Sequence, residues 1–126
     1  MGTPEPMNRR QALGKWGEEV ARRYLLNRGY RILQQNVRTP YGEIDLIVQR
    51  DEDPIVIFVE VKTRASSALG WPEESVTLRK ASHLLASAEH YATEHGIESW
   101  QIDVISIIGT RGKGYRLKHF ENALGG

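Results

Sequence analysis

Three charged side chains on two neighbouring segments have the types and spacing that suit metal-dependent hydrolysis. Asp45 precedes the apolar run 46–48, and Glu60, with Lys62 two positions later, follows the apolar run 55–59. The break between the two runs is short and acidic and contains a proline. Two β-branched, apolar runs divided in this way predict a β-hairpin with a four-residue loop.

The register of this hairpin decides where the two carboxylates lie. If Arg50 pairs with Ile55, the residue opposite Asp45 is Glu60, and opposed residues on antiparallel strands have Cβ atoms about 4.5–5.5 Å apart. Lys62 then lies one step further along the same face. The sequence therefore predicts two adjacent carboxylates with an ammonium group beside them.

Two interpretations of the carboxylate pair are open. Opposed like charges destabilise a sheet, and burial raises the pKa of one of them. A divalent cation removes the conflict, because hard cations take carboxylate oxygens as ligands. The alternative is a structural strand end, at which Lys62 only balances the charge of Glu60.

The side chains around the pair predict a sheet that is covered on both faces. One face of the hairpin is apolar throughout and consists of Ile44, Leu46, Val48, Ile55, Ile57, Val59 and Val61. The other face is apolar near the turn and charged at its far end, whereas a face open to solvent is more usually polar along its length. We expect the carboxylates in a polar notch at one end of a buried sheet.

Length and composition indicate one ordinary globular domain. The chain has 126 residues, of which 40% are hydrophobic and 26% charged. We expect a flexible N-terminus at 1–8 and a single domain over 9–126. The absence of cysteine excludes disulfides, cysteine-ligated zinc and thiol catalysis. No apolar run has the length of a membrane span or forms a signal-peptide core, so the expected location is the cytoplasm, without a membrane partner.

Charge is distributed unevenly along the chain. Residues 1–50 carry nine basic and five acidic side chains, residues 51–110 carry four and ten, and residues 111–126 carry four and one. Arginine, which binds phosphate bidentately, supplies twelve of the seventeen basic side chains. Basic ends around an acidic middle suit a protein that holds a polyanion near a carboxylate centre, and an ordinary solvated surface explains the same pattern equally well.

The remaining pattern predicts an α/β fold, with a mixed sheet, two helices packed on it and the element order α, β, β, β, α, β, β. Apolar residues at helical spacing indicate a helix over 9–28 that ends at Gly29. Glu18 is expected at the edge of the buried face of this helix, beside Gly17. A short strand over 30–33 then leads into the hairpin.

The second half of the chain adds the second helix and the last strands. We expect a short strand at 74–76, a helix from an N-cap at Thr77 to about Gly96, a strong strand over 99–108 and a basic strand over 115–120. The Gly-rich turn before the last strand contains Arg111 and Lys113. It could contact a nucleic-acid backbone, but turns of this composition are also common without any ligand.

Three motifs together resemble a known family. They are Glu18 on the first helix, Gly42-Glu43-Ile44-Asp45, and Phe58-Val59-Glu60-Val61-Lys62-Thr63-Arg64. The chain resembles the YraN family of small bacterial proteins, which in turn resembles archaeal Holliday-junction resolvases and restriction-endonuclease-like nucleases with an Asp…Glu-x-Lys signature. The similarity extends over nearly the whole chain.

The resemblance implies a restriction-endonuclease-like fold and a role for each motif residue. Asp45 and Glu60 would bind Mg²⁺ or Mn²⁺, Lys62 would orient the attacking water or stabilise developing negative charge, and Glu18 would be an outer carboxylate that steadies the metal or its waters. Many relatives have Arg-Phe-Asp in the late strand where this chain has Gln101-Ile102-Asp103, so Asp103 is left out of the predicted site.

These implications lead to two hypotheses about function. The first is a metal-dependent endonuclease that hydrolyses phosphodiester bonds in DNA, with structured or branched DNA of repair or recombination as its substrate. Arg64, Lys15, Arg111 and Lys113 would contact the nucleic acid, and a homodimer is expected by analogy with the resolvases. The second is a catalytically inactive nucleic-acid-binding module on the same fold.

Overall fold

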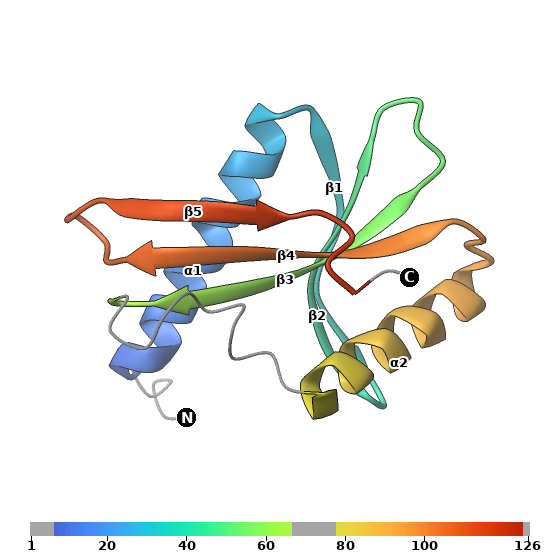
Figure 1. The fold of residues 1–126 in the computed structure, drawn as a ribbon, viewed down its shortest axis with the longest axis horizontal. Coiled ribbons are helices and arrows are strands. Elements are labelled where there is room, and N and C mark those ends of the chain that lie inside the picture. The colour runs from blue at the N-terminus through green and yellow to red at the C-terminus, as the bar shows by residue number, and fades with distance from the viewer. Residues whose placement is uncertain (1–6, 67–77, 125–126) are drawn as a thin grey trace, which may run out of the picture.

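The computed structural model describes residues 7–66 and 78–124, which form a mixed five-stranded sheet with a helix on each face (Figure 1). The elements are α1 (Arg9–Asn27), β1 (Tyr30–Thr39), β2 (Gly42–Arg50), β3 (Val56–Arg64), α2 (Leu78–His95), β4 (Trp100–Gly109) and β5 (Tyr115–Phe120). This order confirms the predicted α/β architecture. The strand expected at 74–76 and the N-cap expected at Thr77 lie outside the described residues.

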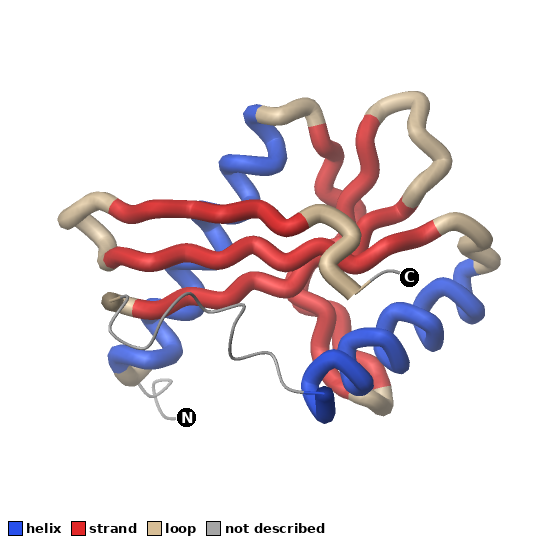
Figure 2. The backbone as a smooth tube through the Cα atoms, viewed as in Figure 1, coloured by secondary structure: helices blue, strands red, loops and turns tan. Residues whose placement is uncertain are grey.

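The strands lie in the sheet in chain order, from β1 to β5. Every neighbouring pair is antiparallel except β3 and β4, which are parallel. Parallel neighbours need a crossover connection, and α2 lies within that connection (Figure 2). The parallel pair brings the C-terminal ends of β3 and β4 to the same edge of the sheet.

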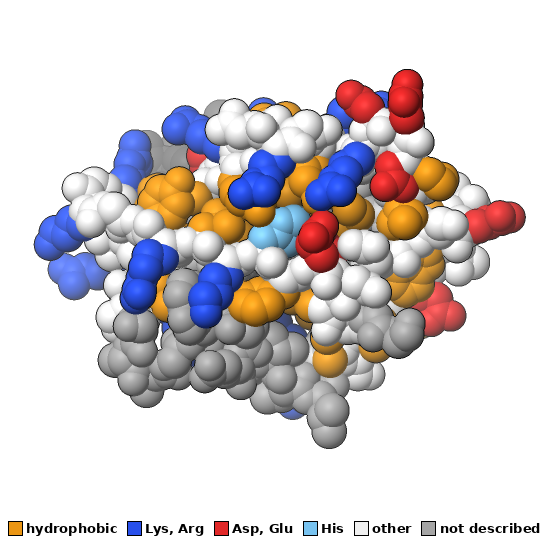
Figure 3. All heavy atoms as spheres, turned by 45° about the horizontal axis from the view of Figure 1, so that its top comes forward, with side chains coloured by type: hydrophobic (Ala, Val, Ile, Leu, Met, Phe, Trp, Pro, Cys, Tyr) orange, Lys and Arg blue, Asp and Glu red, His pale blue; other side chains and the backbone are white. Residues whose placement is uncertain are grey.

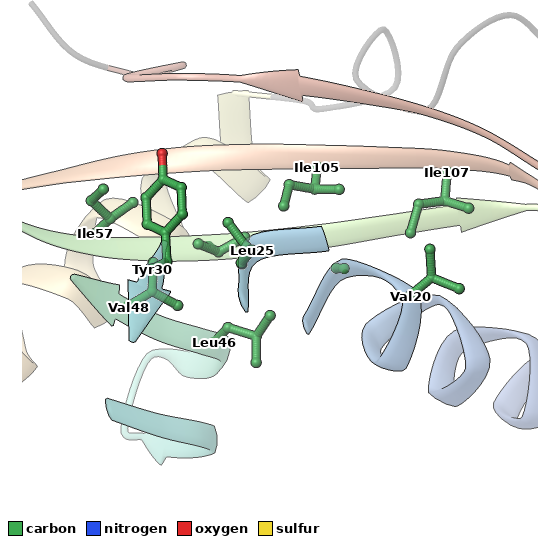
Figure 4. Packing of buried hydrophobic residues seen from close by; sticks show 10 residues of the cluster. Val20, Leu25, Tyr30, Leu46, Val48, Ile57, Ile105 and Ile107 are labelled. Carbon is green, nitrogen blue, oxygen red and sulfur yellow. The ribbon is translucent and has the colours of Figure 1, made fainter. Parts of the chain in front are cut away.

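Two apolar clusters hold the helices against the sheet. On one face, Val20, Ala21 and Leu25 of α1 pack against strand residues such as Val59 and Ile105 (Figure 4). On the other face, the buried residues from α2 and the strands are Ile44, Ile47, Val56, Phe58, Ala88, Ala92 and Ile102. A sheet covered on both faces is therefore confirmed, and it explains why the middle of each central strand is apolar on both sides.

The first helix begins and ends at the signals in its sequence. The side chain of Asn8 accepts a hydrogen bond from the backbone of Gln11, whose own side chain accepts one from the Asn8 backbone, which completes a capping box. After Asn27 the chain leaves the helix through Gly29, whose positive φ of 86° favours glycine.

The hairpin register agrees with the prediction. Gln49 pairs with Val56 and Leu46 with Val59, which is the register that opposes Asp45 to Glu60. The regular pairing stops at Leu46 and Val59, so the two strands diverge just before the carboxylates. Edge strand β1 is longer than the predicted 30–33, because exposed polar residues hide its second half from an apolar pattern.

The prediction that Ile44 shares a face with Leu46 and Val48 is wrong. Leu46 and Val48 pack on the α1 side of the sheet, whereas Ile44 belongs to the cluster on the α2 side. Ile44 lies beyond the last regular β2–β3 pair. A strand segment released from one partner can twist further, and the strict alternation of side chains is then lost.

Candidate functional site

Asp45 lies where β2 separates from β3. Its carboxylate oxygen Oδ2 accepts a hydrogen bond from the backbone N–H of Val61, at 2.8 Å. In a continuous ladder that N–H would point to a backbone carbonyl of β2. A side-chain carboxylate therefore completes the pairing of β3, and this contact fixes its position on the sheet.

The carboxyl group of Asp45 faces that of Glu60. Burial and the charge of Glu60 raise the pKa of Asp45 to about 8, the Val61 amide opposes the shift, and the charge of Glu18 adds to it. A hydrogen bond between the Asp45 and Glu60 side chains contributes as well. Ionising both carboxylates in such contact is unfavourable unless a cation lies between them.

Glu60 is buried, with 8% of its surface exposed, and it has two cationic neighbours. The ammonium group of Lys62 lies 3.1 Å from Glu60 Oε1, and that of Lys80 on α2 lies 3.4 Å from the same oxygen. The ion pair expected from the structural interpretation is thus present. This ion pair compensates the negative charge of Glu60, whereas Asp45 has no cationic partner of this kind among the described residues and keeps a raised pKa.

Glu18 reaches this region from α1 because the helix approaches β3 closely. A Cβ added at Gly17 would collide with the side chain of Thr63, so only glycine permits this approach. Burial, then the charges of Glu43 and Glu60, raise the pKa of Glu18, and Lys15 lowers it.

Asn36 joins two of the surrounding carboxylates. With its carboxamide nitrogen turned toward them, it donates to Glu18 Oε1 at 2.7 Å and to Glu43 Oε1 at 3.1 Å. Its φ of 50° lies in the left-handed region, which asparagine tolerates better than most residues. This contact links β1 to the carboxylates of α1 and β2.

The donor set suits a hard divalent cation. Asp45 and Glu60 offer oxygen atoms only, and burial together with the charge of Glu60 raises the pKa of Asp45, a cost that a bound cation would reduce. Glu18 lies further out, since it does not join them in a group whose ligand atoms all lie within 4.8 Å of one another. Asp45 and Glu60 could therefore both supply oxygen ligands to one cation, and Glu18 is a nearby third carboxylate that interacts electrostatically with each of them.

A second group with metal-ligand types lies elsewhere. Among the described residues, Asp103, His119 and Glu121 have ligand atoms within 4.8 Å of one another. His119 Nε2 lies 2.7 Å from Asp103 Oδ2, and its Nδ1 lies 3.0 Å from the hydroxyl of Tyr24. The other Asp103 oxygen accepts from the Gln101 side chain and the Asn122 backbone.

Every ligand atom of Asp103 and His119 is thus engaged within the protein. Asp103 is completely buried, and His119 joins it to α1. This group ties β5 and α1 to β4, and a metal would have to break its hydrogen bonds to enter. Sequence reasoning excluded Asp103 from the carboxylate site, and it gave no sign of the partner His119.

The predicted phosphate-binding residues lie at one end of the sheet. Arg64 ends β3, and the turn with Arg111 and Lys113 follows β4 beyond the position paired with Arg64. Lys15 is exposed on α1, one turn before Glu18. Figure 3 shows basic side chains gathered at the β4–β5 turn and acidic ones at the opposite end of that face.

Sequence reasoning missed Lys80, Asn36 and Ser106. Ser106 pairs with Lys62 in the parallel ladder, so the two side chains share a face. Its hydroxyl is buried and finds no hydrogen-bond partner among the described residues. No local pattern marks these residues, because Lys80 and Asn36 meet the carboxylates, and Ser106 lies beside Lys62, only through packing of separate segments.

Comparison with known proteins identifies the family. A model of the family described as "Uncharacterised protein family UPF0102" matches residues 17–107. The chain belongs to this family. UPF0102 is the YraN family, so the resemblance found in the sequence is confirmed.

UPF0102 relatives match over almost their entire length. The protein of Syntrophomonas wolfei is 44% identical and the match covers 93% of this chain and 99% of the relative. The protein of Dehalococcoides mccartyi is 42% identical, with 92% and 95% covered. Both relatives are described only as UPF0102 proteins.

Among solved structures, this UPF0102 chain is similar to Hjc, a Holliday junction resolvase from Archaeoglobus fulgidus. The two are 15% identical, the TM-score is 0.49 and the match covers 86% of each chain. Neither described helix is long and apolar enough to cross a membrane.

Proposed function

We propose that this protein is an endonuclease that uses Mg²⁺ or Mn²⁺ to hydrolyse phosphodiester bonds in DNA, with structured or branched DNA of repair or recombination as its substrate. The observation that carries the proposal is the Asp45–Glu60 pair. Lysine neighbours compensate one of its two carboxylates, and the other has a pKa of about 8. A protein that only needed a stable strand end would place an amide or an apolar residue there.

Each site residue has a role in this reaction. Asp45 and Glu60 would hold the cation, and Glu18 would orient the water molecules around it. The cation, when bound, supplies the Lewis acidity that activates water and offsets charge at the phosphate. Lys62, held against Glu60, donates hydrogen bonds to the attacking water or to the phosphate oxygens as negative charge develops.

DNA would be held by the basic end of the molecule. Arg64 at the end of β3, Lys15 on α1, and Arg111 and Lys113 in the turn after β4 would contact backbone phosphates. Binding of this kind releases counterions, so we expect affinity to fall steeply with salt. A homodimer would let two centres act on two strands, which suits a branched substrate.

The second candidate function is a nucleic-acid-binding module without catalysis. It is favoured by the two lysines that already pair with Glu60, since these pairs compensate part of the charge without a metal. Such a module would bind DNA equally well with or without divalent cations.

One assay separates the two functions. Linear, flapped and four-way DNA are incubated with Mg²⁺ or Mn²⁺ and with the parent protein, Asp45→Ala, Lys62→Ala or the control Asp51→Ala, whose side chain is 74% exposed. The enzyme predicts metal-dependent cleavage that falls at least about 100-fold in the first two variants and persists in the control. Binding without cleavage, unchanged in Asp45→Ala, would establish the module instead.

A further inference from the structure

A cavity of about 400 Å³ adjoins the carboxylate pair on the α2 side. Its lining includes Glu43 of β2, Glu60 of β3, Arg79 and Lys80 on the first turn of α2, and the exposed Tyr41. The volume is within the roughly 300–1,000 Å³ of small-ligand sites. One side of the cavity thus borders the proposed metal centre, and another side is cationic.

The cationic wall has the chemistry of a phosphate site. Arg79, Lys80 and His83 lie within two turns of the N-terminus of α2, where the helix dipole also favours an anion. Lys80 bridges the two walls through its ion pair with Glu60. A phosphate bound here would therefore lie directly beside the carboxylates.

Tyr41 adds an aromatic surface that is held in place by its turn. The hydroxyl of Thr39 accepts a hydrogen bond from the backbone N–H of Tyr41, and it contacts the hydroxyl of Ser87 on α2 at 3.0 Å. The Tyr41 ring meets His90 edge to face, yet 52% of the residue stays exposed. A large aromatic ring fixed at the rim of a polar cavity can stack on a planar group.

These features together select one kind of ligand. We propose that the cavity binds one unpaired nucleotide of the DNA substrate, next to the cleaved phosphodiester. Its phosphate contacts Arg79 and Lys80, and its base stacks on Tyr41. Bases in a duplex are already stacked on their neighbours, so only a base that has left the helix can reach the ring.

The inference deepens the proposed function and rests on it for the position of the cleaved bond. It narrows the substrate to DNA with at least one unpaired nucleotide beside the cleavage site, as at a flap or a branch point. Nucleotide binding itself needs neither the metal nor cleavage, because Arg79, Lys80 and Tyr41 lie outside the proposed ligand set.

The test uses 2-aminopurine deoxyribonucleoside 5′-monophosphate, whose fluorescence is quenched when its base stacks. In EDTA, we expect saturable quenching by the parent protein, at least about fivefold weaker binding in Tyr41→Ala and recovery in Tyr41→Phe. Arg79→Gln is expected to weaken binding of the monophosphate but not of the corresponding nucleoside. Tyr115→Ala, a tyrosine of equal exposure, and Arg31→Gln are the ring and charge controls.

The outcomes of the two proposals can be told apart. Equal quenching by the parent protein and Tyr41→Ala, or equal losses in the controls, would overturn the nucleotide site and leave the nuclease proposal standing. Loss of quenching in Tyr41→Ala from a protein that cleaves no DNA would support the site and remove the nuclease. If the cavity acts during cleavage, Tyr41→Ala should slow cutting of flapped DNA more than Tyr115→Ala does.

Discussion

The backbone amide of Val61 donates a hydrogen bond to the side chain of Asp45, at 2.8 Å, where β2 and β3 separate. A carboxylate that we propose as a metal ligand thus takes the place of a strand carbonyl. Because the Asp45 carboxylate accepts a backbone hydrogen bond of β3, its side chain is held in one conformation. Burial at this position, and then the charge of Glu60, raise the pKa of Asp45 to about 8 despite the hydrogen bond from the amide.

The raised pKa of Asp45 predicts a pH-dependent stability. An unperturbed aspartate carboxyl has a pKa of 3.8 and that of Asp45 in the folded protein is about 8, so the folded state binds more protons between these values. Stability from this group is complete below about pH 4 and is lost as pH rises through 8. In EDTA at pH 9, the free energy of unfolding of Asp45→Asn should therefore exceed that of the parent protein by on the order of 2 kcal/mol.

Urea unfolding at several pH values measures this difference. The control is Asp51→Asn, which alters an exposed carboxylate paired with Arg31. We expect the advantage of Asp45→Asn to disappear below pH 4. Parallel stability curves for the parent and Asp45→Asn from pH 4 to pH 9 would show that this carboxylate is not strained.

Divalent cations should stabilise the fold through Asp45 and Glu60. A ligand that binds only the folded state adds about 2.7 kcal/mol at a hundredfold excess over its Kd. We expect Mn²⁺ to raise the melting temperature of the parent protein and to have little effect on Asp45→Asn or Glu60→Gln. Asp103→Asn should keep the full Mn²⁺ effect, and losing it there would move the metal to the Asp103–His119 group.

The close approach of α1 to β3 predicts opposite effects for two glycines. Gly17→Ala should destabilise the protein by about 1–3 kcal/mol, because the new methyl group collides with Thr63. Gly14→Ala should be neutral or stabilising by up to about 1 kcal/mol, since nothing lies within 4 Å of its added Cβ. Chemical denaturation measures both, and equal effects would mean that the helix is not held by this contact.

Gly17→Ala should also weaken Mn²⁺ binding, which calorimetry can measure at a temperature where the variant is folded. The reason is that the collision shifts Glu18 away from the carboxylate pair. Unchanged Mn²⁺ affinity in a folded Gly17→Ala protein would exclude Glu18 from the metal centre.

The buried Asp103–His119 pair should be structural. Removing one partner leaves the other without its hydrogen bonds, so Asp103→Ala is expected to cost about 3–5 kcal/mol of unfolding free energy. The pair of His90 and Glu94, whose side chains are 31% and 61% exposed, is the control, and Glu94→Ala should cost less than about 1 kcal/mol. Thermal unfolding measures both effects. Because this group is expected to hold no metal, EDTA should not alter its contribution to the stability of the parent protein.

The sequence alone contained the information for the hairpin and its carboxylates. Alternating apolar residues and a short acidic turn set the β2–β3 register, because a shift by one residue would move charged residues into the wholly apolar face. Helical spacing located Glu18, and Gly29 marked the end of its helix. These features depend on residues close together in the chain, where the period of side chains is regular.

Tertiary structure decided which other side chains complete the site. Lys80 reaches Glu60 from α2, and Asn36 joins Glu18 to Glu43 from an edge strand. Ile44 lies on the other face because β2 pairs with β3 only from Leu46 onward, which no apolar pattern records. Each of these contacts depends on how separate elements pack and twist against one another. The energy of that packing comes from residues far apart in the chain, so no local sequence pattern reveals it.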